Sequence, residues 1–393
     1  MVGRDVNSSP TQYRTWVVDG YSPDLDGYYY TGLKSGPEPF VDVSAYKIPD
    51  DAIMDFNLST PQHWHRSWRH MPEAIYSSQL AVIDGYIYLF GGQESDKIYR
   101  APTNNPADWE DTGATLPTKL GGASYADPND GYIYLIGGLV DEAVKTIYRA
   151  QKTDPLSWTN LGDKLPEAVQ KSSLIIADGY IYLLGGEGIN HALDKIFRAT
   201  VVAPTVWTDT GYTLPVRMYG SVPAIVDGYM YLFGGLLNED DPTNFIYRAP
   251  LTDPLNWDNA GFLPYSGAYG QFVTIGTHGY LFTSADLSES ATPSGYFTRI
   301  FRCNLTTPYQ WVDTQALLPG ELSQSQLAVI YDRVFLFGGN GNSIVLACDQ
   351  KLKYLPTNPQ AVAYGNTTRV LYPAATVLDR FKVLGYPAWK TDY

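Results

Sequence analysis

The residues best suited to chemistry are three histidines near the N-terminus. His63, His65 and His70 lie within eight residues, and His63 and His65 would share one face of a strand. Imidazole nitrogens placed in this way could bind a metal ion, but a site needs a third convergent ligand and supporting partners. A closing strand rich in His and Trp is the favoured interpretation. We therefore expect no metal and no other cofactor.

Acidic side chains form two further candidate sites. Asp24 and Asp26 resemble the start of a calcium loop, but the later acidic ligands are missing, which favours a simple turn. The loop of Glu239, Asp240 and Asp241 could bind a cation or a polar ligand, or it could be a solvated loop. The chain has no nucleophile elbow, phosphate-binding loop, HExxH or dinucleotide-binding motif, so no catalytic residue is assigned.

A repeated nine-residue phrase defines the elements that must position these residues. The starts of its copies are about 50 residues apart, a period typical of stacked supersecondary units. Tyr alternates with Ile or Leu along the phrase, as expected for a strand. The copies are DGYIYLFGG (84–92), DGYIYLIGG (130–138), DGYIYLLGG (178–186) and DGYMYLFGG (227–235), with weaker ones at 278–286 and 332–339.

Each unit carries three more strands, which predicts an all-β fold. A short apolar strand follows a Leu-Pro pair, a third strand reads IYRA or a close variant, and a fourth carries Trp. Four short antiparallel strands at this period describe the blade of a β-propeller.

The number of blades depends on how the two ends of the repeat region close the ring. Residues 56–72 match a third and fourth strand, and 361–365 and 369–373 resemble a first and second strand. The favoured arrangement therefore has seven blades, the last shared by both ends of the region. The alternative has six, with the Trp64 strand completing the sixth blade.

Charged residues at fixed positions of the unit predict ion pairs within blades. An Arg in the third strand recurs together with an Asp two residues after the fourth-strand Trp. The N-terminal segment shows the same positions with the charges exchanged. We expect cross-strand contacts because opposite charges on facing strands attract each other. The pairs are Arg100–Asp111, Arg198–Asp209, Arg302–Asp313 and Asp55–Arg66.

The fifth unit departs most from the others. Its Gly-Gly pair is replaced by Ser284-Ala285, and the following loop is extended to 286–299. Loops at one end of a propeller converge on the axis, so an unusual loop can shape a binding site. Asp286, Tyr296 and Phe297 are the candidate ligand contacts, and the two aromatic rings could stack on a sugar. A loop that grew without gaining a function is the competing interpretation.

Two segments lie outside the repeat region, which covers residues 53–373. The N-terminal extension, 1–52, is rich in Tyr, Gly, Pro and Asp, and the tail, 374–393, also carries aromatic residues. Aromatic arms beside a closed ring suggest docking onto other protein subunits. The alternative is that both arms pack against the propeller itself.

The charge of the chain limits its partners. The formal net charge is −14, so nothing would neutralise the phosphates of a nucleic acid or of an anionic membrane surface. No apolar stretch reaches about 18 residues, and no secretory leader is recognised. The expected location is therefore a virion or the cytoplasm.

The strand that ends in Gly-Gly, followed by Tyr and Trp at fixed offsets, resembles the kelch repeat over roughly residues 53–373. The resemblance implies a propeller that in most members is a binding scaffold and in a minority an enzyme. The copies depart from the family in using IYRA where many kelch repeats have Tyr-Asp. They also mostly lack the Arg after Leu-Pro, with Arg217 near that position. Fold alone does not choose the function.

A non-enzymatic binding or structural module is the favoured function. Within it we expect a virion component, such as a phage tail, fibre or capsid-attached protein, that is anchored by its arms and displays the propeller for protein or glycan binding. Such a protein would be detected in purified particles. One alternative is a lectin that uses Trp and Tyr at loop tips.

Another alternative is a sugar-active enzyme that resembles the sialate mutarotases. The resemblance would require Arg, Glu and His at one mouth of the ring, with Arg217, His191, Glu187 and His278 as candidates. A copper enzyme resembling galactose oxidase is disfavoured, because both cysteines occupy scaffold positions of the repeat.

Overall fold

The computed structural model describes residues 2–3, 14–22, 27–32, 64–66, 70–286, 296–318, 323–330, 333–339, 343, 345–348, 361–364 and 367–370. The chain divides into two compact units: Gln62–Cys348, and Met1–Pro61 together with Asp349–Tyr393. Within the described residues, no helix has the length and apolar character needed to cross a membrane.

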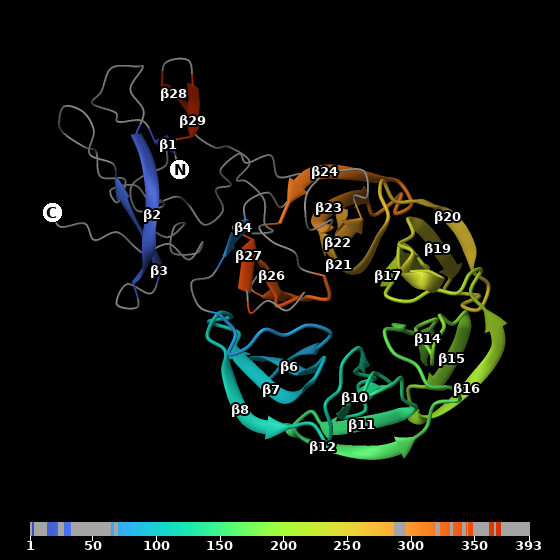
Figure 1. The fold of residues 1–393 in the computed structure, drawn as a ribbon. Coiled ribbons are helices and arrows are strands. Elements are labelled where there is room, and N and C mark those ends of the chain that lie inside the picture. The colour runs from blue at the N-terminus through green and yellow to red at the C-terminus, as the bar shows by residue number, and fades with distance from the viewer. Residues whose placement is uncertain are drawn as a thin grey trace. The chain divides into compact units, whose positions relative to one another are not determined.

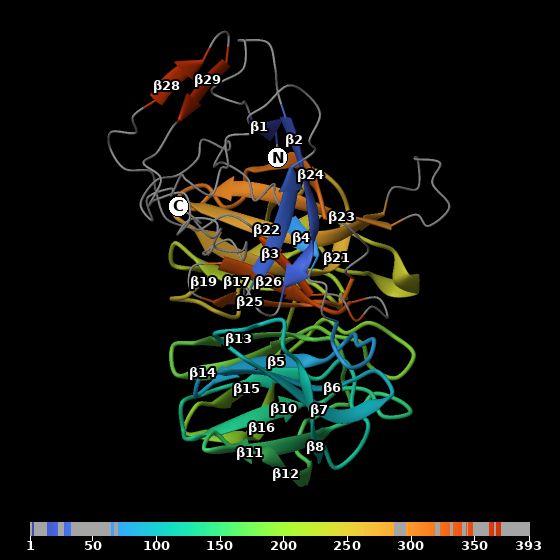
Figure 2. The ribbon, with the colours of Figure 1, turned by 90° about the vertical axis from the view of Figure 1, so that its left-hand side faces the viewer.

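The larger unit is a β-propeller of six four-stranded antiparallel blades arranged in a ring, which Figure 1 shows along its axis and Figure 2 from its edge. Blade 1 consists of β5 (Gln79–Ile83), β6 (Tyr86–Gly92), β7 (Ser95–Pro102) and β8 (Glu110–Thr115). Blade 2 consists of β9 (Ser124–Ala126), β10 (Tyr132–Ile136), β11 (Thr146–Gln151) and β12 (Asp154–Asp163). Blade 3 consists of β13 (Ser173–Ala177), β14 (Tyr180–Leu184), β15 (Lys195–Thr200) and β16 (Ala203–Thr213).

Blades 4 to 6 complete the ring. Blade 4 consists of β17 (Val222–Val226), β18 (Tyr229–Phe233), β19 (Phe245–Pro250) and β20 (Asp258–Phe262). Blade 5 consists of β21 (Gly267–Ile275), β22 (His278–Asp286), β23 (Tyr296–Asn304) and β24 (Trp311–Leu317). Blade 6 consists of β25 (Gln326–Ile330), β26 (Arg333–Phe337), β27 (Val345–Cys348) and β4 (Trp64–Arg66). A short 3₁₀ helix, η3 (Asn238–Asp240), lies between β18 and β19.

The ring closes with six blades, so the favoured count of seven is wrong and the alternative is right. Within the described residues the last repeat supplies three strands of this blade, and β4 pairs antiparallel with β27 as the fourth, with Ala347 opposite His65. The segments assigned to a seventh blade, β28 (Ala361–Tyr364) and β29 (Thr367–Val370), form a two-stranded sheet of their own in the smaller unit. Closure by β4 covers an edge that would otherwise be exposed.

The smaller unit contains a second sheet at the N-terminus. Its three strands are β1 (Val2–Gly3), β2 (Arg14–Ser22) and β3 (Gly27–Gly32), in the order β1-β2-β3. The N-terminal extension therefore contains β structure of its own. Its role as a docking arm stays a prediction.

The Gly-Gly pair at the end of the repeated phrase joins neighbouring blades. The first glycine has a positive φ, which the absence of a Cβ makes easy. The second glycine donates its N–H to a backbone carbonyl of the next blade, so the phrase forms a contact that recurs around the ring. The bonds are Gly92 to Leu120 (2.9 Å), Gly138 to Val169 (2.8 Å), Gly186 to Met218 (2.8 Å), Gly235 to Gly267 (2.8 Å) and Gly339 to Ile75 (2.9 Å).

Aromatic packing adds to the boundaries between blades where the second strand ends in Phe. The fourth-strand Trp of one blade meets the second-strand Phe of the preceding blade, with ring centroids 5.0 Å apart for Trp158 and Phe90. Trp109 of blade 1 makes the equivalent contact with Phe337 of blade 6, at 5.1 Å. The boundary at which the ring closes is therefore packed like those between blades 1 and 2 and between blades 4 and 5.

Three of the four predicted Arg–Asp contacts are wrong, because these three pairs are out of register by one residue. Asp111 lies opposite Tyr99, and Arg100 lies opposite Glu110. Neighbouring residues of a strand project to opposite faces, so Arg100 and Asp111 cannot meet. The same offset separates Arg198 from Asp209 and Arg302 from Asp313. Asp55 lies outside the described residues, which leaves its pairing with Arg66 a prediction.

The conserved position of the arginines within the repeat has a different explanation. In blades 1 to 4 the Arg lies over the first Tyr of the repeated phrase in its own blade, a favourable cation–π contact. The distances from the guanidinium carbon to the ring centre are 4.8 Å for Arg100 and Tyr86, 4.3 Å for Arg149 and Tyr132, 4.7 Å for Arg198 and Tyr180, and 4.7 Å for Arg248 and Tyr229.

The acidic position of the repeat caps a turn. Asp209 accepts the backbone N–H of Gly211 at 2.9 Å, and its other oxygen lies 3.2 Å from Lys195 Nζ. Asn160 and Asn259, at the same position of other blades, accept the N–H of the glycine two residues on at 2.7 and 2.8 Å. An Asx turn therefore explains why Asp and Asn alternate at this position.

Replacing Asp209 with Asn should reveal a small pH-dependent stabilisation. The Gly211 N–H and then Lys195 lower the pKa of the Asp209 carboxyl. A lowered folded-state pKa adds stability above the unfolded value of about 3.9 that is lost as the pH falls through the folded value. We expect Asp209→Asn to cost under about 1 kcal/mol at pH 7, since solvent screens this exposed pair, and nothing in acid. Urea unfolding from pH 7 to pH 2 measures the difference. A cost that stayed constant with pH would contradict the assignment.

Candidate axial binding site

A closed circle of backbone hydrogen bonds surrounds the axis of the ring. Six residues, one before or within the first strand of each blade, donate their N–H groups to the equivalent carbonyls of the preceding blade over 2.7–3.4 Å. All six have φ between 52° and 62°, a conformation that residues other than glycine rarely adopt. Such strain persists only where the surroundings impose it. The axial circle consists of Ser77, Gly122, Lys171, Gly220, Tyr269 and Gln324.

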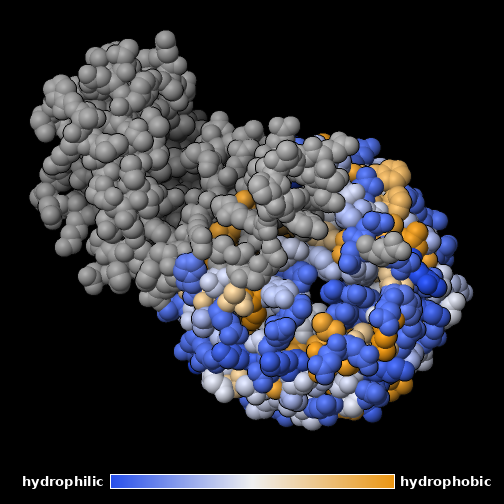
Figure 3. All heavy atoms as spheres, in the orientation of Figure 1, coloured by the Kyte–Doolittle hydropathy of each residue, from blue (hydrophilic) through white to orange (hydrophobic). Residues whose placement is uncertain are grey.

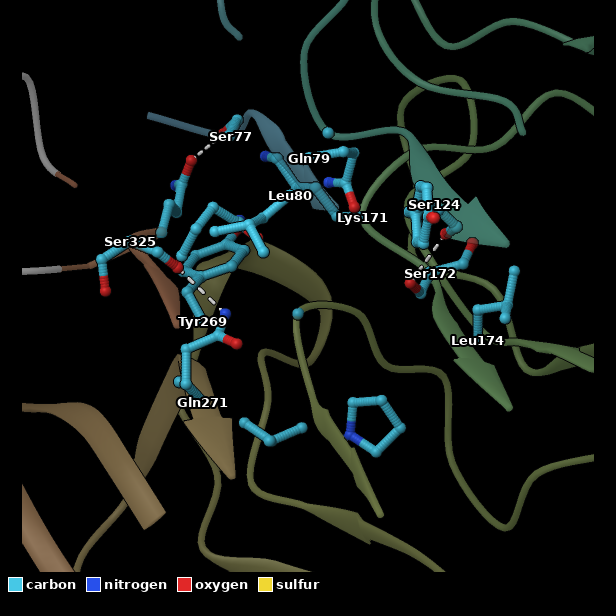
Figure 4. A pocket seen from close by; sticks show the side chains of 18 of the residues that line it. Ser77, Gln79, Leu80, Ser124, Lys171, Ser172, Leu174, Tyr269, Gln271 and Ser325 are labelled. Carbon is cyan, nitrogen blue, oxygen red and sulfur yellow. Dashed lines mark hydrogen bonds between the residues drawn. The ribbon is translucent and has the colours of Figure 1, made fainter. Parts of the chain in front are cut away.

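A pocket of about 390 Å³ lies at this circle, lined by its six residues and by the residues that follow them in each blade (Figure 4). Figure 3 shows the surface hollowed at the centre of the ring, with hydrophilic residues around much of the hollow. The volume of the pocket is typical of a site for a small molecule.

The walls of the pocket combine neutral polar groups with apolar ones. Hydroxyl and amide side chains are supplied by Ser77, Gln79, Ser124, Ser172, Ser221, Gln271, Gln324, Ser325 and Gln326. Equivalent positions of the six blades add the apolar surfaces of Leu80, Tyr125, Leu174, Pro223, Phe272 and Leu327.

Hydrogen bonds to the scaffold hold several of the polar groups in place. Ser77 and Gln324 bond to each other, and Gln271 Nε2 donates to the Ser325 carbonyl at 2.9 Å. An amide has further positions for hydrogen bonding beyond such a contact. The walls can therefore bind a polar molecule that carries no charge.

Lys171 is the one charged side chain among the described residues of the pocket lining. Its Nζ lies 2.9 Å from Glu187 Oε2 and 5.5 and 5.7 Å from the rings of Tyr219 and Tyr269. A Cβ at Gly220 would lie 2.6 Å from the Tyr269 ring, so this close approach requires glycine. The ammonium group is therefore held by a carboxylate and two aromatic rings.

The acidic loop singled out from the sequence reaches the same cluster through Asp240. Tyr219 donates its hydroxyl to the Asp240 carboxylate, and burial followed by this contact raises the pKa of the Tyr219 hydroxyl. Asp241 is exposed and does not line the pocket. Glu239 lies within η3. The loop thus borders the axial site, and ligand binding by its side chains stays a prediction.

The long loop of the fifth unit starts from an extended hairpin. Asp286 pairs with Tyr296 and Ala285 with Phe297 at the ends of β22 and β23. Each of these strands has nine residues, whereas β14 of blade 3 has five and β15 six. The hairpin carries the candidate residues past the end of a normal blade. Their contact with a ligand stays a prediction.

The four residues proposed for a sugar-active enzyme differ in their ion-pair partners and in their place in the blades. Glu187 joins Lys171, while His191 Nε2 lies 3.9 Å from Glu167 and Arg217 Nε lies 3.8 Å from Asp194. His278 starts β22, at the end of its blade opposite to the Gly-Gly loops. Glu187 thus forms an ion pair with a residue of the pocket lining, whereas Glu167 and Asp194 lie outside the lining.

The possible metal ligands are only partly within the described residues. His70 Nδ1 lies 3.3 Å from Ser343 Oγ, and His65 lies within β4, while His63, Asp24 and Asp26 are outside the described residues. Across the described part of the chain, no group of three or more His, Cys, Asp or Glu side chains could hold a metal ion.

The residues of the axial circle were missed because their types are ordinary and they are far apart in the sequence. A signal was present all the same. Ser77, Lys171 and Gly220 each lie seven residues before the Asp that starts the repeated phrase, and the other three lie within about two residues of that offset. Comparing residues at that offset would have picked out Lys171 as the one charged residue of the six.

No known protein family matches this sequence, and no curated protein matches it. Among solved structures, that of YjhT is similar, with a TM-score of 0.57 and 13% sequence identity over 70% of this chain and 94% of YjhT. At this identity the likeness shows a shared fold and leaves the chemistry of the axial pocket to be argued from its own residues.

Proposed function

We propose that this chain is a kelch-type propeller that acts as a non-enzymatic binding module and takes a small carbohydrate in its axial pocket. The observation that carries the proposal is the composition of the pocket walls, where neutral amides and hydroxyls alternate with apolar and aromatic side chains. Sugars present hydroxyl groups along their edges and C–H groups on their faces. Walls of mixed polarity suit both kinds of surface.

The repeated phrase supports the kelch assignment, because its Gly-Gly pair makes the same contact between blades wherever it occurs. A virion role, with the terminal segments as docking arms, stays a prediction from the composition. Display of a binding propeller on a particle would be compatible with the axial site.

Replacing Tyr269 with Ala should weaken carbohydrate binding at least about fivefold, since an aromatic stacking partner contributes about 1 kcal/mol beyond the area it buries. The measurement is saturation-transfer NMR with a panel of neutral monosaccharides, followed by calorimetry on those that bind. Tyr265→Ala is the matched control, because Tyr265 is 42% exposed and does not line the pocket.

The same spectra separate the alternatives. If no sugar binds, or if both variants bind as the natural chain does, the proposal is wrong. Interconversion of anomers faster than in buffer alone, or the appearance of a product signal, would identify a sugar-active enzyme instead.

A further inference from the structure

We propose that Glu187 makes the axial pocket selective for uncharged ligands by neutralising Lys171, the cation that would otherwise attract acidic ones. The inference rests on the proposed function and specifies its ligand class as neutral. It concerns charge selection at the pocket, and it makes Glu187 a residue that acts through Lys171.

The position of Glu187 supports this role. Its carboxylate lies 2.9 Å from Lys171 Nζ, with 28% of its side chain and 23% of that of Lys171 exposed. Glu187 does not line the pocket, whereas Lys171 does. An anion in the pocket could therefore reach the ammonium only in competition with a carboxylate that is already bound to it.

The backbone fixes this arrangement. Glu187 donates its N–H to the Gln170 carbonyl at 2.8 Å and accepts the Gln170 N–H at 2.9 Å. Gln170 directly precedes Lys171, so the ion pair joins two segments that are bonded to each other by an isolated β-bridge. The two aromatic rings next to the ammonium add further restraint, because Lys171 Nζ lies within about 6 Å of both ring centres.

The repeat itself provides an internal comparison. Leu139 and Leu236 occupy the position of Glu187 in blades 2 and 4, where they make the same bridges with Gly121 and Tyr219. The scaffold therefore accepts an uncharged residue there. Glu occurs at this position in the blade that supplies the lysine of the axial circle, which identifies it as a partner for that lysine.

The surrounding charge acts in the same direction. Asp240 accepts the hydroxyl of Tyr219, whose ring lies beside Lys171. The cluster thus contains two carboxylates and one ammonium group, in a chain whose formal net charge is −14. An approaching anion is repelled both locally and at long range.

The test is NMR titration of ¹⁵N-labelled protein, read at the backbone amides of Gly122 and Gly220. The probes are glucuronate and inorganic phosphate as anions and glucose as the neutral partner of glucuronate. We expect the natural chain to show no saturable shift with either anion. Glu187→Gln should give a saturable shift with at least one of them, at an affinity at least about tenfold above the limit set by the natural chain, because Lys171 loses its competing carboxylate.

Four further variants make the result specific. Glu187→Asp keeps the negative charge and should still exclude anions. Glu187→Leu introduces the residue found at this position in blades 2 and 4, and it should gain anion binding, which serves as the test if Glu187→Gln does not fold. Glu167→Gln removes a carboxylate paired with His191 and should change nothing. Adding Lys171→Met to Glu187→Gln should abolish the gain.

Anion binding by the natural chain as tight as that of Glu187→Gln would overturn the inference, and so would folded Glu187→Gln and Glu187→Leu proteins without any gain. If these variants gain anions while no neutral sugar binds the natural chain, the carbohydrate proposal fails and charge selection by Glu187 stands.

Discussion

Alanine at position 234 is expected to lower the free energy of unfolding by about 3–5 kcal/mol or to prevent folding. Gly234 is the first glycine of the Gly-Gly pair in blade 4 and has a φ of +59°. A Cβ at this position would lie 2.1 Å from the carbonyl oxygen of Gly267, the group that accepts the N–H of Gly235. The methyl group would therefore push blade 5 away from blade 4 and break the bond between them.

A matched control separates this clash from the conformational penalty. Gly211 has a φ of +76°, and a Cβ there would have no atom within 4 Å. Gly211→Ala should cost only the left-handed conformation, about 1–2 kcal/mol. Urea unfolding followed by Trp fluorescence measures both variants. Equal losses at the two positions would show that contact between blades is not what the glycine provides.

The repeated phrase was sufficient to predict the fold, because it indicates a strand, the turns on either side of it and the spacing of the repeat. Its Asp-Gly and Gly-Gly pairs bracket a strand of alternating Tyr and apolar residues. The count of blades was harder, since residues 361–364 and 367–370 do form strands but pair outside the ring. Strand propensity is a local property, whereas the choice of a partner strand is not.

The cross-strand ion pairs failed for a related reason. Arg100 and Asp111 recur at fixed offsets in the sequence, but an irregularity in register lies between Lys97 and Tyr99 of β7. A shift of one residue reverses the face on which a side chain lies. Spacing along the chain therefore showed that these positions matter without showing what they contact.

The sequence predicted one residue that contacts the cluster around Lys171, and it did not predict the residues of the axial circle. Asp240 drew attention through the charge of its loop, and it does contact the cluster around Lys171 through Tyr219. Ser77, Tyr269 and Gln324 have side chains common in any loop, and only the closed circle of hydrogen bonds brings them together. That circle depends on all six blades, and so it is absent from any single repeat.

If the propeller is closed between blades 6 and 1, removing the Phe337 side chain should lower the free energy of unfolding as much as removing the equivalent Phe between two consecutive blades. Phe337 is 1% exposed, and its ring meets Trp109 of blade 1 with centroids 5.1 Å apart. We expect Phe337→Ala to cost about 3–5 kcal/mol, the range for a buried Phe in a packed core. Phe90→Ala is the control, because Phe90 is equally buried and meets Trp158 at 5.0 Å between consecutive blades. Urea unfolding compares the free energies of unfolding of the two variants.

A small loss of stability for Phe337→Ala beside a large one for Phe90→Ala would mean that blades 6 and 1 separate in solution. The axial circle, which includes the bond from Ser77 to Gln324, would then be open as well.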